Sequence, residues 1–346
     1  MHARADEAAT LLAGLRSGTG DEGLGSPFGE PILVIDVDGG DPVDLRIPSG
    51  WPCVVVAVSA TTTPPLVPVG PDVFLSAAAD PPAPWVGMGS EIDQATRRFE
   101  SAVGANPQAA TALAQIVRLG VALDPAQALV VESLAYSTLQ AGPEHHSWLE
   151  DHPDRRADAR TDPAVTIERR ADELWLTLER PERRNAFSAR MRDDLVAALR
   201  FANLDPANGA IHLQGSGPSF CSGGDLGEFG TLADPATAHG IRTMRSAAWW
   251  MNELADRITV HLRGTCVGAG IELAAFAGMV EAAPDTRLIL PEVGMGLVPG
   301  AGGTASIPRR IGPARTAWLA ISGEPLDAPT ALSWGLVDRL TEDHTG

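Results

Sequence analysis

The sequence predicts an α/β fold for its second half, on the strength of two observations. Beyond residue 163, short runs rich in apolar residues alternate with segments of helical periodicity, and two of the connections between them are rich in glycine. Strands that alternate with helices form an open, at least partly parallel sheet covered by helices. The chain of 346 residues is long enough for about two domains and a sizeable core.

The first half predicts strands followed by helices. Residues 1–30 are typical of a weak helix and a glycine-rich stretch. Strands are expected at 31–37, 53–59 and 73–75, within a region (60–90) otherwise too rich in proline for regular structure, and helices at 91–103, 107–119 and 125–141. Asn106 and Asp124 each precede a proline, which predicts an N-cap followed by a first-turn proline, and Gly142 is placed to end the third helix. Residues 143–163 are polar and without periodicity, which predicts a linker.

The second half alternates more regularly. Strands are expected at 164–169, 174–179, 210–214, 257–262, 279–283 and 286–290, and helices at 188–202, 234–254, 270–277 and, as several small ones, over 303–333. In open α/β sheets, ligands bind where loops leave the strand ends, so the glycine-rich loops are the places to look for a site.

Composition excludes several functions. All 26 basic residues are arginine against 44 acidic residues, a formal net charge of −18. Without lysine, neither a Schiff base nor a P-loop can form, and the negative charge argues against nucleic acid or a membrane surface as a partner. Three widely spaced cysteines and the absence of an apolar leader predict a cytoplasmic protein. Histidines cluster near 145–152 without recognised ligand spacing, so no metal is expected.

Two loops have the same design of a strand, glycines and a helix start. They run over 219–226 (Ser-Phe-Cys-Ser-Gly-Gly-Asp-Leu) and 264–273 (Gly-Thr-Cys-Val-Gly-Ala-Gly-Ile-Glu-Leu). Small residues let backbone N–H groups approach a ligand closely, and two such groups converging on one carbonyl oxygen form an oxyanion hole. The alternative is that both are tight turns without a ligand.

A third segment, residues 290–304 (Leu-Pro-Glu-Val-Gly-Met-Gly-Leu-Val-Pro-Gly-Ala-Gly-Gly-Thr), identifies a family resemblance. Together with the two loops, the opening segment 178–187 and the segment 321–338, it resembles the crotonase (enoyl-CoA hydratase/isomerase) superfamily, which acts on acyl-CoA thioesters. The resemblance covers about 164–340 and implies a crotonase-like ββα spiral fold with an N-terminal extension that contains strands and a helical segment.

The resemblance implies specific roles. The backbone N–H groups of Gly224 and Ala269 would hold the thioester oxygen, and Glu272 and Glu292 occupy the positions of the hydratases' catalytic carboxylates. The expected substrate-binding residues are Arg184, Ala186, Ser222, Gly223, Asp225, Leu226, Gly268, Pro299 and Gly300. No cofactor is expected, since coenzyme A is part of the substrate, and without lysine its phosphates must meet arginine or backbone N–H groups, with Arg180, Arg183 and Arg184 as candidates. Each glutamate has an alternative, Glu272 as an acid favoured by a helix dipole and Glu292 as a solvated loop carboxylate.

The family normally continues past its Gly-Leu-Val-Asp segment with several helices, whereas this sequence ends at Gly346. Residues 91–156 resemble those helices in order, so a rearranged chain is one hypothesis and an unrelated helical appendage the other. The expected organisation is an N-terminal extension of unknown role (1–90), a helical segment with linker (91–160) that under the first hypothesis replaces the family's C-terminal helices, and a catalytic core (161–346).

The leading functional hypothesis is therefore a lyase that hydrates a 2-enoyl-CoA or catalyses the reverse dehydration. Isomerisation of a double bond, thioester hydrolysis and cofactor-free oxygenation are alternatives, because one fold hosts many chemistries. A catalytically silent partner subunit is an alternative of another class. The pocket wall is expected over 226–252, including Trp249 and Trp250, and the resemblance implies a homotrimer or a hexamer.

Overall fold

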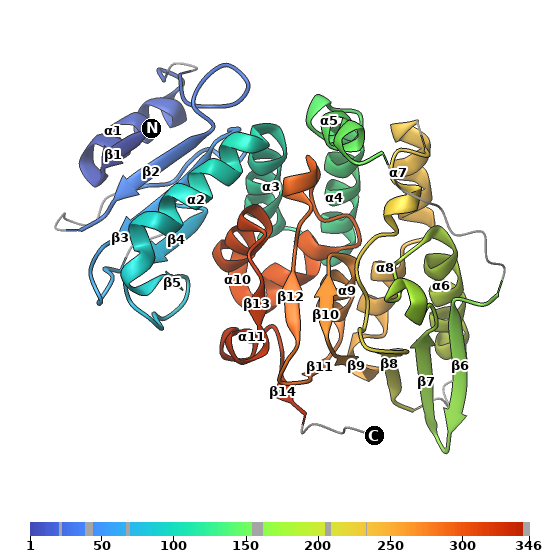
Figure 1. Ribbon diagram of the computed structural model, residues 1–346. Coiled ribbons are helices and arrows are strands. Elements are labelled where there is room, and N and C mark those ends of the chain that lie inside the picture. The colour runs from blue at the N-terminus through green and yellow to red at the C-terminus, as the bar shows by residue number, and fades with distance from the viewer. Residues whose placement is uncertain are drawn as a thin grey trace.

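The computed structural model describes residues 1–20, 23–38, 44–66, 70–153, 162–204, 209–232 and 234–341. Figure 1 shows two sheets at opposite sides of the molecule with a layer of helices between them. The α/β class and the N-terminal extension with strands and helices are thus confirmed.

The N-terminal sheet has five parallel strands in chain order. They are β1 (His2–Arg4), β2 (Ile32–Asp36), β3 (Val54–Ser59), β4 (Val73–Ser76) and β5 (Val86–Gly87). In β2, Leu33 and Ile35 join a core with Leu12 of helix α1 (Ala5–Ser17), while Ile32 and Val34 point to the opposite core. Both faces are therefore covered, which explains the unbroken apolar runs of these strands. The short β1 and β5 escaped prediction because so few residues carry no periodicity.

Four helices follow: α2 (Ile92–Ala105), α3 (Pro107–Gly120), α4 (Pro125–Gln140) and α5 (Pro143–Asp151). Asp124 caps α4 as predicted, accepting a hydrogen bond from the Gln127 N–H. Asn106 makes no side-chain cap. Instead, the Glu144 carboxylate accepts hydrogen bonds from the N–H groups of Gln108 and Ala109 at 2.7 and 3.0 Å, so α5 caps α3.

The linker prediction for 143–163 is wrong over Pro143–Asp151, which form α5, while residues 154–161 lie outside the described part of the chain. The helix lacks an apolar stripe because a histidine occupies its buried position. His145 is buried, and its Nδ1 lies 2.9 Å from the carbonyl oxygen of Met295.

The larger sheet has the strand order β14-β11-β9-β8-β7-β6, in which only the β6–β7 pair is antiparallel. Its strands are β6 (Val165–Arg170), β7 (Glu173–Leu178), β8 (Ile211–Gly215), β9 (Ile258–Leu262), β11 (Met279–Ala282) and β14 (Arg339–Leu340), and a small third sheet joins β10 (Thr265–Val267), β12 (Arg287–Ile289) and β13 (Leu326–Asp327). All six strands predicted beyond residue 163 are present.

The helices of this half are α6 (Ala189–Leu204), α7 (Pro235–Met244), α8 (Ala247–Glu253), α9 (Ala269–Glu272), α10 (Gly303–Ser322) and α11 (Ala328–Trp334). The single helix predicted over 234–254 is wrong: it breaks at Arg245, and Ser246 caps α8 by accepting from the Trp249 N–H at 3.0 Å. The prediction of several small helices over 303–333 is confirmed: α10 consists of two helical parts joined at Gly312, whose φ of 79° is not helical, and α11 follows.

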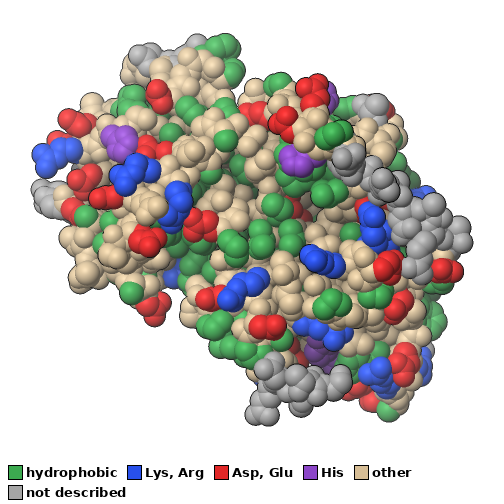
Figure 2. All heavy atoms as spheres, viewed as in Figure 1, with side chains coloured by type: hydrophobic (Ala, Val, Ile, Leu, Met, Phe, Trp, Pro, Cys, Tyr) green, Lys and Arg blue, Asp and Glu red, His purple; other side chains and the backbone are tan. Residues whose placement is uncertain are grey.

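The two halves share one core. A continuous cluster of buried apolar side chains includes Leu113 and Val117 of α3, Ile307 and Leu319 of α10, and Leu213 of β8. Helices α3 and α4 pack against α10, which places the N-terminal helical segment beside the last third of the chain (Figure 1). Acidic and basic side chains are intermixed on the face shown in Figure 2. Among the described residues, no helix is both long and apolar enough to cross a membrane.

Candidate active site

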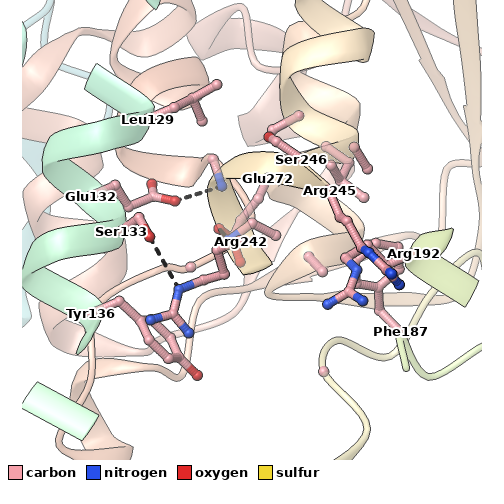
Figure 3. Close-up of a pocket in the computed structure, with 18 of the residues that line it drawn as sticks. Leu129, Glu132, Ser133, Tyr136, Phe187, Arg192, Arg242, Arg245, Ser246 and Glu272 are labelled. Carbon is pink, nitrogen blue, oxygen red and sulfur yellow. Dashed lines mark hydrogen bonds between the residues drawn. The ribbon is translucent and has the colours of Figure 1, made fainter. Parts of the chain in front are cut away.

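A cavity of about 470 Å³ lies between α4, the start of α6, the α7–α8 junction and the turn before α10 (Figure 3). Five of the residues singled out in the sequence line it: Gly224, Ala269, Glu272, Glu292 and Gly300. They come from four separate loops or helix starts of the second half. The fold therefore brings the glycine loops and both glutamates to one place.

Two backbone N–H groups at this cavity are unused. In the described part of the chain, neither the Gly224 N–H nor the Ala269 N–H donates to a protein acceptor. The first loop is held by its neighbours, because the Phe187 N–H donates to the Gly223 oxygen at 2.7 Å. At the second loop Gly268 takes a positive φ of 48° with ψ of −117°, a conformation that favours glycine, so Ala269 begins α9 without positive φ. Alanine is therefore tolerated at this position, as a backbone donor requires only the N–H.

Glu272 is buried at the end of α9. Its Oε2 accepts hydrogen bonds from the N–H groups of Ala301 and Gly303, at 2.7 and 2.9 Å. Burial raises the pKa of this carboxyl above its ordinary value, although the backbone donors act in the opposite direction. Both of these hydrogen bonds go to Oε2, and the carboxyl lines the cavity, where a ligand can reach it.

Glu292 stands at the start of the turn Val293–Met295 and faces the same cavity. Its Oε2 is buried and has no hydrogen-bond partner in the described residues. Burial, and then the neighbouring charge of Glu272, raise the pKa of Glu292 well above 4.5. A Cβ atom at Gly268 would collide with Glu292 Oε1, so glycine leaves room for this carboxyl.

A third glutamate, which the sequence did not single out, completes the cluster. Glu132 is buried on α4 and accepts from the N–H groups of Gly302 and Thr304 at 2.7 and 2.8 Å, and from the Thr304 hydroxyl at 2.7 Å (Figure 3). Burial, and then the charge of Glu272, raise its pKa. The available signal was that Glu132 is the one charged residue in the apolar segment 125–140.

Arg242 and Tyr136 also line the cavity and were not predicted. The Arg242 guanidinium lies over the Tyr136 ring, 4.4 Å from its centroid, and donates to Ser133 on α4 (Figure 3). Within the predicted wall, Trp249 lines the cavity. Trp250 packs edge-on against the ring of Trp249 and is not a lining residue.

The remaining predicted residues lie outside this cavity. Asp225 lines an adjoining cavity of about 410 Å³. Its carboxylate accepts from Arg180 at 2.8 Å and from Arg183 at 3.0 Å, so two of the three arginines suggested for phosphate binding already have an anionic partner. The others, which line neither cavity, are Arg184, Ala186, Ser222, Gly223, Leu226, Gly268 and Pro299. Arg184 is exposed, with φ of 49°.

The geometry is suited to acid–base chemistry next to a carbonyl group. Two unused N–H donors can stabilise an oxyanion. Two carboxyls, the buried Glu272 with backbone donors and the half-buried Glu292 with a buried oxygen that has no partner in the described residues, can divide the roles of base and acid, because their environments differ.

Known proteins resemble the second half of the chain. Residues 170–345 match the family model described as enoyl-CoA hydratase/isomerase. The chain is 33% identical over 176 residues to 1,2-epoxyphenylacetyl-CoA isomerase of Escherichia coli (strain K12), a match that covers 50% of this chain and 67% of that protein. It is 32% identical over 177 residues to 2,3-dehydroadipyl-CoA hydratase of the same organism, covering 51% of this chain and 68% of the relative. Among solved structures, an enoyl-CoA hydratase from Thermoplasma volcanium GSS1 aligns with a TM-score of 0.47 and 33% identity over 53% of this chain and 73% of the other. Other relatives are matched over slightly less, 64% and 65% of their length.

Proposed function

The chain belongs to the enoyl-CoA hydratase/isomerase family, whose crotonase-like fold it has, and on that premise we propose that it is an enzyme that hydrates a 2-enoyl-CoA thioester or catalyses the reverse dehydration. The observation that carries the proposal is the pair of carboxyls, Glu272 and Glu292, that face one cavity with two backbone N–H groups unused in the described part of the chain. No cofactor is needed, since coenzyme A is part of the substrate.

The thioester oxygen binds the N–H groups of Gly224 and Ala269. When water adds to C3, negative charge moves through C2 to this oxygen, and the two donors stabilise the enolate that forms. Loss of one such donor typically costs about 3 kcal/mol of transition-state stabilisation. Both donors are fixed by backbone conformation and need no reorganisation during the reaction.

The environments of the two glutamates assign their roles. Glu272 accepts two backbone hydrogen bonds, which favour its ionised form, so it takes the proton from the attacking water. Among the described residues Glu292 has a buried oxygen without a hydrogen-bond partner, and burial and then the charge of Glu272 raise its pKa, which favours the protonated form, so Glu292 is the acid that delivers a proton to C2. Glu132 holds the turn from which Glu272 receives its hydrogen bonds and acts as a positioning residue.

The helical segment 91–153 completes the catalytic domain in this proposal. Helix α4 supplies one wall of the cavity, including Glu132, and α5 contributes the cap on α3. The support comes from the packing of α3 and α4 on α10. Residues 1–90 then remain as the additional part of the chain. A homotrimer or hexamer is expected, and light scattering on the purified protein tests that state.

The test is incubation of the protein with 2-enoyl-CoA thioesters of several chain lengths in deuterated water. Hydration removes the ultraviolet absorbance of the conjugated thioester, adds the mass of one water molecule and places deuterium at C2. An isomerase would remove the absorbance without a gain of water, and a thioester hydrolase would release free coenzyme A. Unchanged thioesters at every chain length would overturn the proposal and favour a silent partner subunit.

A further inference from the structure

Arg242 is a largely buried cation whose hydrogen-bond partners are all neutral. Its guanidinium donates to the hydroxyls of Ser133 and Ser137, and more weakly, at 3.5 Å, to the side-chain oxygen of Gln140. A guanidinium has five N–H donors, so these three hydrogen bonds leave about two free. Transfer of a charge from water into a protein interior is costly unless an opposite charge accompanies it.

The other arginines of the same cavity differ. Arg192 and Arg245 both pair with the carboxylate of Asp193, Arg192 at 2.7 Å. In the part of the chain that the structure describes, no carboxylate oxygen lies within 4.0 Å of the Arg242 guanidinium. Among the described residues, Arg242 is therefore the cavity arginine without a carboxylate in direct contact; the charge of Glu132 acts on it only from beyond 4.0 Å.

The place of Arg242 also favours a ligand. Arg242 and Tyr136 line both the cavity of about 470 Å³ and the adjoining one of about 410 Å³, so they stand where the two meet. The Tyr136 hydroxyl has no hydrogen-bond partner among the described residues. Ser133 and Tyr136 follow Glu132 within about one turn of α4, which puts this junction roughly 5 Å along the helix from the carboxyl cluster.

We propose that Arg242 and the Tyr136 hydroxyl bind a carboxylate carried by the acyl group, so that the substrate class is the coenzyme A thioester of a dicarboxylic acid. This rests on the proposed function for the position of the thioester at Gly224 and Ala269. The guanidinium presents its free N–H groups to the two carboxylate oxygens, the arrangement in which arginine binds carboxylates most strongly. The acyl carboxylate replaces the missing counter-ion.

The test measures binding of saturated thioesters, which have no double bond to hydrate, by calorimetry. Succinyl-, glutaryl- and adipyl-CoA are each compared with the monocarboxylic thioester of the same carbon number, butyryl-, valeryl- and hexanoyl-CoA. At one or more lengths the wild type is expected to bind the dicarboxylic member at least about tenfold more tightly. This is the gain in affinity that a hydrogen bond between charged groups typically provides. A protein that binds the monocarboxylic member as tightly at every length overturns the proposal, whether or not it hydrates enoyl thioesters.

Arg242→Met is expected to remove this preference, and Arg245→Met, in the same cavity but paired with Asp193, is the matched control that keeps it. Equal weakening of both members by Arg242→Met would show that Arg242 serves the coenzyme A phosphates or the fold, and loss of preference in Arg245→Met would move the site to that residue; either result refutes the assignment. The same pairs as pantetheine thioesters, which lack the nucleotide phosphates, are expected to retain the preference. If Arg242→Met does not fold, the wild-type comparison still decides the substrate class.

Discussion

Glu132 and Glu272 accept hydrogen bonds from alternate N–H groups of one turn. Ala301 and Gly303 donate to Glu272, whereas Gly302 and Thr304 donate to Glu132. Two carboxyls from different halves of the chain thus hold the N-terminal turn of α10 from two sides, where the helix dipole also favours negative charge. This turn carries the hydrogen bonds that orient Glu272 towards the cavity.

Glu272→Gln and Glu292→Gln are each expected to lower kcat for hydration at least about a hundredfold, because each removes one partner of the acid–base pair. Turnover of a 2-enoyl-CoA is followed by the loss of absorbance. Glu281→Gln is the control, since Glu281 is a buried glutamate that lines neither cavity. Near-normal turnover in either active-site variant would remove that residue from the mechanism.

The pH dependence of kcat/KM is expected to be bell-shaped, with both limbs above 4.5. The acid limb follows protonation of Glu272, and the basic limb follows ionisation of Glu292. Burial and the charges of Glu272 and Glu132 raise the pKa of Glu292. Glu132→Gln removes one of those charges and is expected to shift the basic limb to lower pH. Thr304→Val, which removes a hydroxyl donor to Glu132 without changing charge, serves as the comparison. A basic limb that stays in place in Glu132→Gln would mean that Glu132 acts on structure alone.

Stability is expected to depend on Glu292 in a pH-sensitive way. Because its pKa is raised in the fold, the folded protein binds a proton that the unfolded chain releases above about 4.5, so this group favours folding at low pH and disfavours it as pH rises through the folded pKa. Among the described residues, Glu292 Oε2 makes no hydrogen bond that the Glu292→Gln substitution could break. The Tm of this variant is therefore expected to exceed that of the wild type near pH 8 and to match it near pH 5. The difference in Tm reflects the free energy that the wild type loses when Glu292 ionises in the folded state. Glu253→Gln, at an exposed position, is expected to change neither value.

Gly268→Ala is expected to reduce both activity and stability. The new Cβ would collide with Glu292 Oε1, at a residue with φ of 48°, and strain of this kind costs about 1–3 kcal/mol. Gly294→Ala is the matched control, because a Cβ there meets no atom within 4 Å. Chemical denaturation and the rate of hydration measure the two effects, and equal behaviour of the two variants would contradict the described contact.

Residues 162–346 expressed without the N-terminal half are not expected to fold. Helices α3 and α4 cover α10, and the buried cluster that contains Leu113 also contains Ile307 and Leu319. Their loss exposes that apolar surface to water. Circular dichroism and amide exchange on the fragment provide the measurement. A cooperatively folding, active fragment would show that the helical segment is an appendage.

Helix α5 and the cap on α3 are two features that the local sequence pattern was not sufficient to predict. Residues 143–151 carry no apolar periodicity, because His145 and Glu144 make the contacts that an apolar stripe normally makes. Similarly, Asn106 has the residue type of an N-cap, but the carboxylate of Glu144, distant in sequence, takes that place. The break at Ser246 was also missed, since serine is compatible with a helix interior as well as with a cap.

The sequence by itself determined the α/β class, six of the nine described strands of the second half, the glycine loops and the two glutamates at the cavity, because short-range periodicity and local motifs encode them; β10, β13 and β14, of two or three residues each, are too short for such a pattern. Only the tertiary structure decided that Glu132 reaches Gly302, 170 residues away, and that Arg242 lies beside α4 with neutral partners only. Periodicity reports which face of an element is apolar but not which other element covers it. A buried charge acquires its partner, or lacks one, when distant segments pack together, and that packing fixed both the third carboxyl and the unpaired arginine.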